Sequence, residues 1–159
     1  MKRRKMLLAC ILVVIGLLVV ACASPILRPV NVELQGAAYN TQDLQKIQDV
    51  TLRLKGHQRR YLLRDDALDV TLQLNDREMK FDDEPFYFPG EGLYHAYFHF
   101  YDPTRNHYIS AKLAYDEDFS NVVVIIDAEN VIYAASARGG TTLEDLPEPF
   151  ALFLDDYRS

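Results

Sequence analysis

Alternating apolar and polar positions dominate the chain beyond its first 29 residues, and this alternation predicts β-strands. Val30 to Leu34 alternates in this way and predicts a first strand that ends at Gly36. The stretch from Asn40 to Gln48 has the residue spacing of a short helix instead. Both segments are short, so most of the fold has to be inferred from the residues that follow.

Two later stretches predict β-hairpins, because turn residues separate runs whose apolar positions match across the turn. Gly56–His57 is the expected turn of the first hairpin, and Asn75–Asp76 is the expected turn of the second. In both, the apolar side chains fall on one face, as a half-buried hairpin requires. The expected pairs are Leu52 with Tyr61 and Val50 with Leu63 in the first hairpin, and Leu72 with Met79, Val70 with Phe81 and Gln73 with Glu78 in the second.

The segment Asp82–Leu93 contains two prolines and two glycines and is expected to be a loop. Beyond it, the pattern predicts strands near Tyr94–Tyr101 and His107–Tyr115 and a further strand at Val131–Ala135. Val122–Ile126 is different, because all five of its residues are Val or Ile. Such a run predicts a central strand that is covered on both faces.

The last segment, Pro149–Tyr157, carries apolar residues at helical spacing and predicts a short helix that covers the outer face of Val122–Ile126. Eight or nine short strands joined by tight turns precede this helix. Together they predict a mainly β domain, an antiparallel meander that forms a β-sandwich or a partly open barrel, with a short C-terminal helix. A closed barrel fits the same pattern.

The first 23 residues have a different character. Lys2–Lys5 is basic, and Met6–Ala23 then runs for 18 residues without a charged residue or a side-chain amide. A basic start, an apolar stretch and small residues at its end describe a secretory signal. A run of 18 apolar residues also reaches the lower limit for a membrane-spanning helix, so length alone does not separate the two.

The position of the cysteines narrows the interpretation of this segment. The chain has two, Cys10 and Cys22, and both lie within it, so the domain that follows offers Cys22 no disulfide partner. Val19-Val20-Ala21-Cys22 resembles the lipobox of bacterial lipoproteins, and it ends an apolar stretch that follows a basic start. The resemblance covers only these first 22 residues. It implies cleavage before Cys22 and acylation of the cysteine thiol and of its new amino group.

Other interpretations of the segment stay open. Leu7-Leu8-Ala9-Cys10 fits the same four-residue pattern, but the apolar stretch before it is far too short. A cut after Ala21-Cys22-Ala23, just before Ser24, would release a secreted protein. An uncleaved segment would instead anchor the domain on the outer side, because the basic residues favour an N-terminus inside the cell.

The lipobox resemblance divides the chain into a signal peptide at residues 1–21, a lipidated Cys22 with a tether at residues 22–29, and a single β-rich domain at residues 30–159. It implies a lipoprotein of the bacterial cell envelope, anchored to a membrane through its N-terminal lipid with the domain outside the cytoplasm. Loss of four basic residues from the 17 in the chain leaves 13 Lys and Arg against 23 Asp and Glu, a net charge of −10. This charge argues against nucleic acid, or an anionic lipid surface, as the main partner.

Aromatic residues are concentrated in residues 86–115, which hold ten of the 18 in the chain. Alternation in Tyr94–Tyr101 places one set of side chains in the core and the other set on the opposite face. If Tyr101 pairs with Tyr108, the second face gathers Tyr and His side chains around a lysine. The candidate binding residues are His95, Tyr97, His99, Tyr101, Tyr108 and Lys112. Tyr suits binding because it offers a large contact area and a hydroxyl; the alternative is an ordinary solvated strand face.

Signatures of catalysis and of metal binding are missing from the sequence. His95 and His99, four residues apart on a strand, would lie about 13 Å apart, too far to share a metal ion. The acidic clusters fit solvated turns. The sequence has no nucleophile elbow, P-loop, dinucleotide-binding motif or zinc-peptidase motif. We therefore expect no metal, no cofactor and no enzymatic activity.

Two functions fit these expectations. The first is a lipid-anchored envelope protein whose β domain binds a protein, or another envelope component, without catalysis. The second is a small-molecule carrier with a cavity lined by the aromatic segment, over which Asp82–Leu93 would form a lip.

Overall fold

The computed structural model describes residues 11–16, 19–20, 22–62, 66–90, 92–102, 106–139 and 142–158, and for residues 82–90, 102 and 158 it describes only the backbone. Most of the expected signal peptide, namely residues 1–10, 17, 18 and 21, lies outside the described residues. Within the described residues, no helix combines the length and the apolar character needed to span a membrane.

The described part of the domain contains eight strands and three helical segments. The strands are β1 (Ile26–Asn40), β2 (Lys46–Arg60), β3 (Ala67–Leu74), β4 (Arg77–Gly90), β5 (Leu93–Asp102), β6 (His107–Asp116), β7 (Asn121–Ile126) and β8 (Val131–Ser136). The remaining elements are the 3₁₀ helices η1 (Asp127–Glu129) and η2 (Leu143–Asp145) and the helix α2 (Glu148–Arg158).

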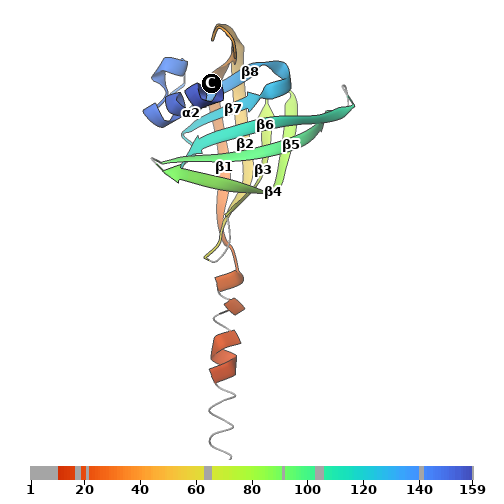
Figure 1. Cartoon of the computed structure of the whole chain (residues 1–159), viewed down its shortest axis with the longest axis vertical. Helices are drawn as coiled ribbons and strands as arrows, with labels where there is room; N and C mark the ends of the chain where they lie inside the picture. The colour runs from red at the N-terminus through yellow and green to blue at the C-terminus, as the bar shows by residue number, and fades with distance from the viewer. Residues whose placement is uncertain are drawn as a thin grey trace, which may run out of the picture.

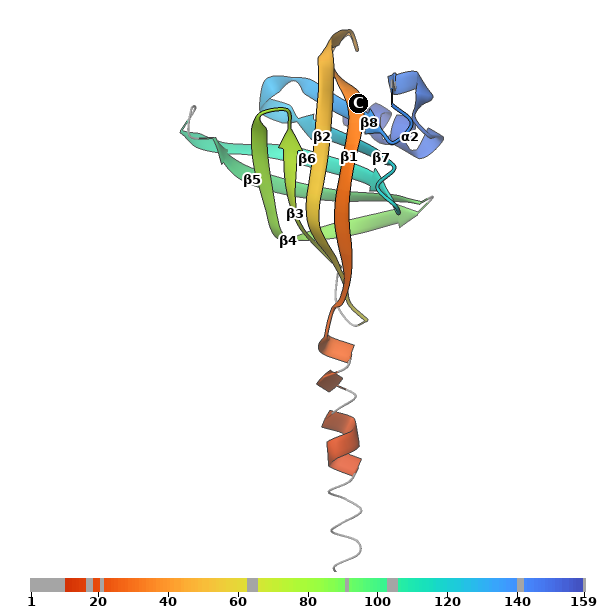
Figure 2. The ribbon, with the colours of Figure 1, turned by 180° about the vertical axis from the view of Figure 1, so that it is seen from behind.

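The strands form a barrel. Each strand pairs antiparallel with the next, and β8 pairs with the second half of β1, which closes the sheet. Figures 1 and 2 show β1, β2 and β3 standing in one wall, while β5, β6 and β7 cross them in the other. The long strand β4 turns between the walls, since it pairs with β3 up to Pro85 and with β5 from Phe86. The mainly β fold, the antiparallel order and the C-terminal helix are as predicted, and the sheet closes as a barrel.

The interior of the barrel is a packed apolar core to which all eight strands contribute. Its largest buried side chains include Leu52, Leu54, Leu68, Leu72, Met79, Phe81, Phe98, Ile109 and Leu113. The Phe81 and Phe98 rings contact one another with centroids 3.8 Å apart. Each fully buried Leu or Phe contributes about 2 kcal/mol by removing apolar surface from water, so this core is the main source of stability.

A second apolar core lies outside the barrel, between its wall and α2. Val123 and Ile125 of β7 and Ile132 of β8 point outward and are covered by Phe150 and Leu154 of the helix. Every residue of Val122–Ile126 is fully buried as a result. The prediction that this strand is covered on both faces, with the C-terminal helix on its outer side, is therefore confirmed.

The predicted turn at Gly56–His57 is wrong, because β2 continues straight through both residues. At Gly56 the backbone of β2 passes so close to β3 that a Cβ atom would lie 2.1 Å from the Asp69 carbonyl oxygen. Its φ of +154° is also one that glycine adopts easily. The glycine thus permits a close strand contact rather than a turn. Leu52 pairs with Leu34 and Leu74 instead of Tyr61. Leu63, the expected partner of Val50, lies outside the described residues.

The first strand is longer than predicted at both ends. It begins at Ile26, within the expected tether, and it continues past Gly36 to Asn40. The expected helix at Asn40–Gln48 is wrong, because residues 41–45 form a turn between β1 and β2 and residues 46–48 already belong to β2. The Asn40 side chain explains this difference, since its Oδ1 accepts a hydrogen bond from the Gln42 N–H and so favours a turn over a helix.

The expected loop Asp82–Leu93 is also wrong, since β4 extends to Gly90 and β5 begins at Leu93. Pro85 is tolerated because it follows a register shift in the β3–β4 pairing, where the ladder is already interrupted. The second predicted hairpin is confirmed pair by pair, with Asn75 in the left-handed conformation of its turn. The Tyr101–Tyr108 register between β5 and β6 is confirmed as well.

Gly36 provides a test of the closed barrel. A Cβ atom at this position would lie 1.9 Å from the Ala134 carbonyl oxygen and 2.6 Å from the Ala135 Cα, both in the backbone of β8. We therefore expect Gly36→Ala to lower the free energy of unfolding by about 3 kcal/mol, measured by chemical denaturation. The control is Gln35→Ala, an exposed neighbouring position where a change within about 0.5 kcal/mol is expected. Equal stability of the two variants would contradict the close approach of β1 to β8.

Candidate binding surfaces

The outer face of the β5–β6 hairpin holds all six predicted binding residues. His95, Tyr97, His99 and Tyr101 alternate with core residues along β5, and Tyr108 and Lys112 lie opposite on β6. The register pairs Tyr97 with Lys112, His99 with Ser110 and Tyr101 with Tyr108. We call these six side chains, together with Ser110, the aromatic surface.

The tyrosines of the aromatic surface leave much of their ring area in solvent. Tyr97, Tyr101 and Tyr108 are 47%, 50% and 71% exposed. Tyr101 and Tyr108 meet edge to face with ring centroids 5.6 Å apart, and the Tyr101 hydroxyl donates a 2.5 Å hydrogen bond to Asn106 Oδ1. These contacts hold the rings in place without covering them, so a partner can bury them at little cost in conformational entropy.

Lys112 links the aromatic surface to the C-terminal helix. Its ammonium nitrogen lies 5.7 Å from the centroid of the Tyr97 ring and 4.6 Å from that of Tyr157 in α2. Both distances are within the range of a cation–π interaction. Lys112, Tyr157 and Asp127 also line an open hollow of about 570 Å³ at this junction. Burial, together with a hydrogen bond to Asp127, raises the pKa of the Tyr157 hydroxyl.

The two histidines of β5 have different surroundings. His95 is half-buried, and its ring lies 5.6 Å from the Tyr97 ring and 5.8 Å from the Phe153 ring of α2. Burial lowers the pKa of His95, and the nearby Asp156 carboxylate opposes that shift in part. His99 is exposed, with its Nδ1 atom 2.9 Å from the Ser110 hydroxyl oxygen. Among the described residues, no group of three or more His, Cys, Asp or Glu is placed to hold a metal ion.

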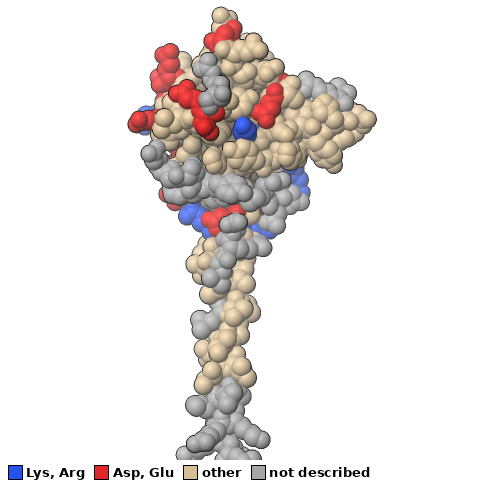
Figure 3. Space-filling view, in the orientation of Figure 1, with Lys and Arg blue, Asp and Glu red and all other residues tan. Residues whose placement is uncertain are grey.

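Acidic side chains flank the aromatic surface on the side of α2. Figure 3 shows most of the Asp and Glu of this face gathered in its upper part, over α2 and the loops beside it. The exposed acidic residues of η2 and α2 are Glu144, Asp145, Glu148, Asp155 and Asp156. The aromatic surface is therefore bordered by negative charge.

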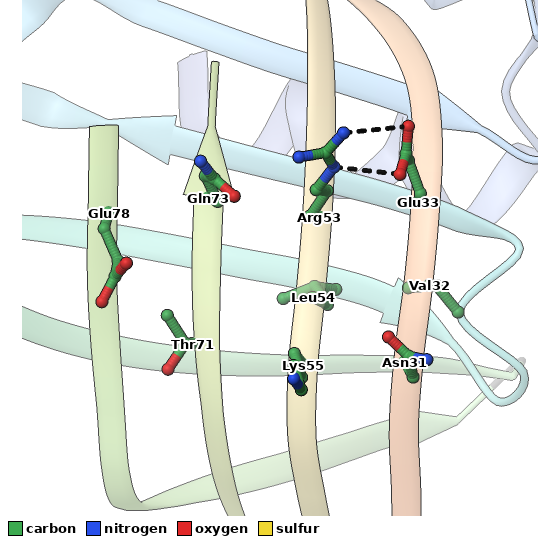
Figure 4. Close-up of a pocket in the computed structure, with 9 residues that line it drawn as sticks. All are labelled: Asn31, Val32, Glu33, Arg53, Leu54, Lys55, Thr71, Gln73 and Glu78. Atoms are coloured by element: carbon green, nitrogen blue, oxygen red, sulfur yellow. Dashed lines mark hydrogen bonds and ion pairs between the residues drawn. The ribbon is translucent and has the colours of Figure 1, made fainter. Parts of the chain in front are cut away.

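A second candidate surface, not predicted from the sequence, lies on the outer face of the opposite wall. There the side chains of four adjacent strands surround a shallow hollow of about 510 Å³ (Figure 4). It is lined by Asn31, Val32, Glu33, Arg53, Leu54, Lys55, Thr71, Gln73 and Glu78. We call it the polar hollow.

One row of polar side chains crosses the polar hollow. The registers set Glu33 beside Arg53, Arg53 beside Gln73, and Gln73 beside Glu78. Arg53 donates to both carboxylate oxygens of Glu33, at 2.9 and 3.4 Å. Both side chains are half-exposed, so this ion pair contributes little stability, about 1 kcal/mol at most. The row offers donors and acceptors to a polar ligand on an open surface.

The barrel interior offers less to a ligand. Among the described residues, the side chains buried in it are mainly apolar, and the Phe98 ring of the aromatic segment packs among them. Two polar side chains, Gln58 and Tyr115, are fully buried in this interior. Burial raises the pKa of the Tyr115 hydroxyl far above its ordinary value, and a hydrogen bond with Gln58 opposes the shift. Tyr115 therefore stays neutral. Because the described interior is a packed core, it gives the carrier hypothesis no support.

His95 gives the fold a predictable response to acid. The unfolded chain binds a proton at this histidine near pH 6.5, whereas the folded chain binds it only at lower pH. The folded state therefore loses stability as the pH falls below about 6.5. We expect His95→Gln to reduce the fall in unfolding free energy between pH 8 and pH 5, measured by urea denaturation. The matched control is His99→Gln, at an exposed position of the same strand. Equal slopes for both variants would contradict the role of His95.

Comparison of the chain with protein-family models, with the curated proteins and with the solved structures finds no match. Its function is therefore inferred from the two surfaces and from the N-terminal segment.

Proposed function

We propose that the chain is a lipid-anchored protein of the bacterial cell envelope whose barrel binds a protein partner without catalysing a reaction. The observation that carries the binding role is the aromatic surface. Three tyrosines are about half exposed or more there, on one hairpin. Large apolar areas left in solvent on a well-packed domain are typical of protein-interaction sites.

The chemistry of the aromatic surface favours a protein partner. Tyrosine is among the residues that contribute most to binding at protein interfaces, because it combines apolar area with a hydroxyl. The acidic border on α2 favours basic side chains at the rim of that partner. The three tyrosines of the surface are also open to solvent rather than enclosed in a site that excludes water, which supports binding rather than catalysis.

The N-terminal segment supports the lipid anchor. Cys22 carries a free thiol and lies only four residues before the start of β1. With no cysteine in the domain, a structural disulfide offers no competing role for it. A cysteine placed this close to a folded domain, at the end of an apolar segment, fits a point of attachment.

Acylation of Cys22 is testable in bacterial cells. Mass spectrometry of the purified protein is expected to find a mature chain that begins at an acylated Cys22, and Cys22→Ala should abolish acylation. The control is Cys10→Ala, which removes the other cysteine that fits the four-residue pattern and should leave the mature chain unchanged. A chain that starts at Met1 or at Ser24 would contradict the proposal.

The binding role is testable by crosslinking in intact cells, followed by identification of the captured proteins. Tyr97→Ala and Tyr101→Ala together should weaken capture of the specific partner by at least about tenfold, which corresponds to about 1.4 kcal/mol. The matched control is the pair Lys55→Ala and Thr71→Ala in the polar hollow, on the opposite wall. Unchanged capture with the tyrosine variants would rule out the aromatic surface. Loss with the control pair would assign binding to the polar hollow.

A further inference from the structure

Exposed aliphatic side chains gather at the end of the barrel where β1 begins. Ile26, Leu27 and Leu62 are 62%, 58% and 67% exposed. Ile26 pairs with Arg60 on β2, so Leu62 follows directly after the paired region at the same end. Figures 1 and 2 show the N-terminal segment leaving the barrel from this end. We call these three side chains the anchor-end rim.

The clustering sets the anchor-end rim apart from the rest of the surface. Of the large aliphatic side chains described from Ile26 onward, only two others are comparably exposed, Ile47 and Leu152. Ile47 lies near the far end of β2, and Leu152 lies on α2. Single exposed aliphatic residues are ordinary, whereas a group at one end of a domain indicates a contact.

The length of the tether identifies what this end contacts. This step rests on the proposed function, in which a lipid on Cys22 holds the chain at a membrane. Only Ala23, Ser24 and Pro25 separate Cys22 from β1, and they allow a reach of about 14 Å from Cys22 to Ile26. The headgroup layer of a bilayer is itself about 5–8 Å thick. The rim is therefore held at the bilayer surface and cannot move far from it.

We propose that the anchor-end rim rests on the bilayer, with Ile26, Leu27 and Leu62 inserted among the lipid headgroups. The domain thereby gains a second, non-covalent attachment to the bilayer in addition to the lipid on Cys22. Insertion at the boundary between headgroups and acyl chains removes the apolar surface of these side chains from water, which is favourable. The barrel then has a fixed orientation, with the β1–β2 turn farthest from the membrane.

The arginines near the rim that the structure describes favour an apolar rather than an electrostatic contact. Arg28 and Arg60 both pair with Glu117, at 3.7 and 3.4 Å. Arg59 pairs with Asp69 at 3.2 Å. Because these arginines have carboxylate partners, the rim does not depend on anionic lipid. The contact is expected to form on a zwitterionic bilayer and to persist in high salt.

A nitroxide label at the rim provides the test. The mature protein of the proposed function has no reactive thiol, so Leu62→Cys introduces a unique labelling site. The acylated full-length mature protein is reconstituted into phosphatidylcholine vesicles, and collisions of the label with oxygen and with a water-soluble nickel chelate are measured. The label at position 62 should be severalfold more accessible to oxygen, relative to nickel, than a label placed by Ile47→Cys. Leu27→Cys gives a second rim position, and both results should persist in 1 M salt.

The outcomes separate this inference from the anchor on which it rests. Flotation of the vesicles reports the anchor independently of the label. A protein that floats with the vesicles, but whose rim labels are as accessible to nickel as the label at position 47, overturns the contact and leaves the anchor in place. A protein that does not float contradicts the anchor and, with it, the contact. A lipid-like signal at both rim positions, with an aqueous signal at position 47, supports the proposal.

Discussion

The barrel depends on one close approach between two backbones, where β1 passes β8 at Gly36. All other strand pairings join neighbours in chain order, and only this pairing converts an open meander into a closed sheet. No side chain fits between the strands at that point, because the Ala134 carbonyl oxygen occupies the space of a Cβ atom. Closure creates the enclosed interior, and it leaves the outer face of β7 and β8 to be covered by α2.

Most strands could be predicted because they depend on local pattern. The Asn75–Asp76 turn and its flanking residues determine their own register, and the five Val and Ile residues of β7 require cover on both faces. Gly56 could not be interpreted in the same way. A glycine in an alternating run fits a turn and a close strand contact equally well, and only Asp69 of the neighbouring strand distinguishes them. The extent of β4 through Pro85 likewise depends on a break in its partner's ladder.

The residues of the aromatic surface could be predicted for a similar reason. Its six predicted members belong to one hairpin, so alternation and one cross-strand pair place them together. Tyr157 and Phe153 of α2 contact the surface, and no local pattern shows where a helix docks. Predicting the polar hollow would require the pairing registers of four adjacent strands, because its lining residues come from all four. Of these registers the sequence predicted only that between β3 and β4.

The pairing between the first strand and the last also affects the order in which the domain folds. The other pairings can form as soon as two successive strands are available, because they join neighbours in chain order. The β1–β8 pairing joins residues about 100 positions apart, so it has to wait for nearly the whole chain. If the N-terminus is already held by a lipid, the first half of β1 lies near the bilayer, and the edge of its second half stays unpaired until β8 reaches it at the end of the barrel away from the membrane.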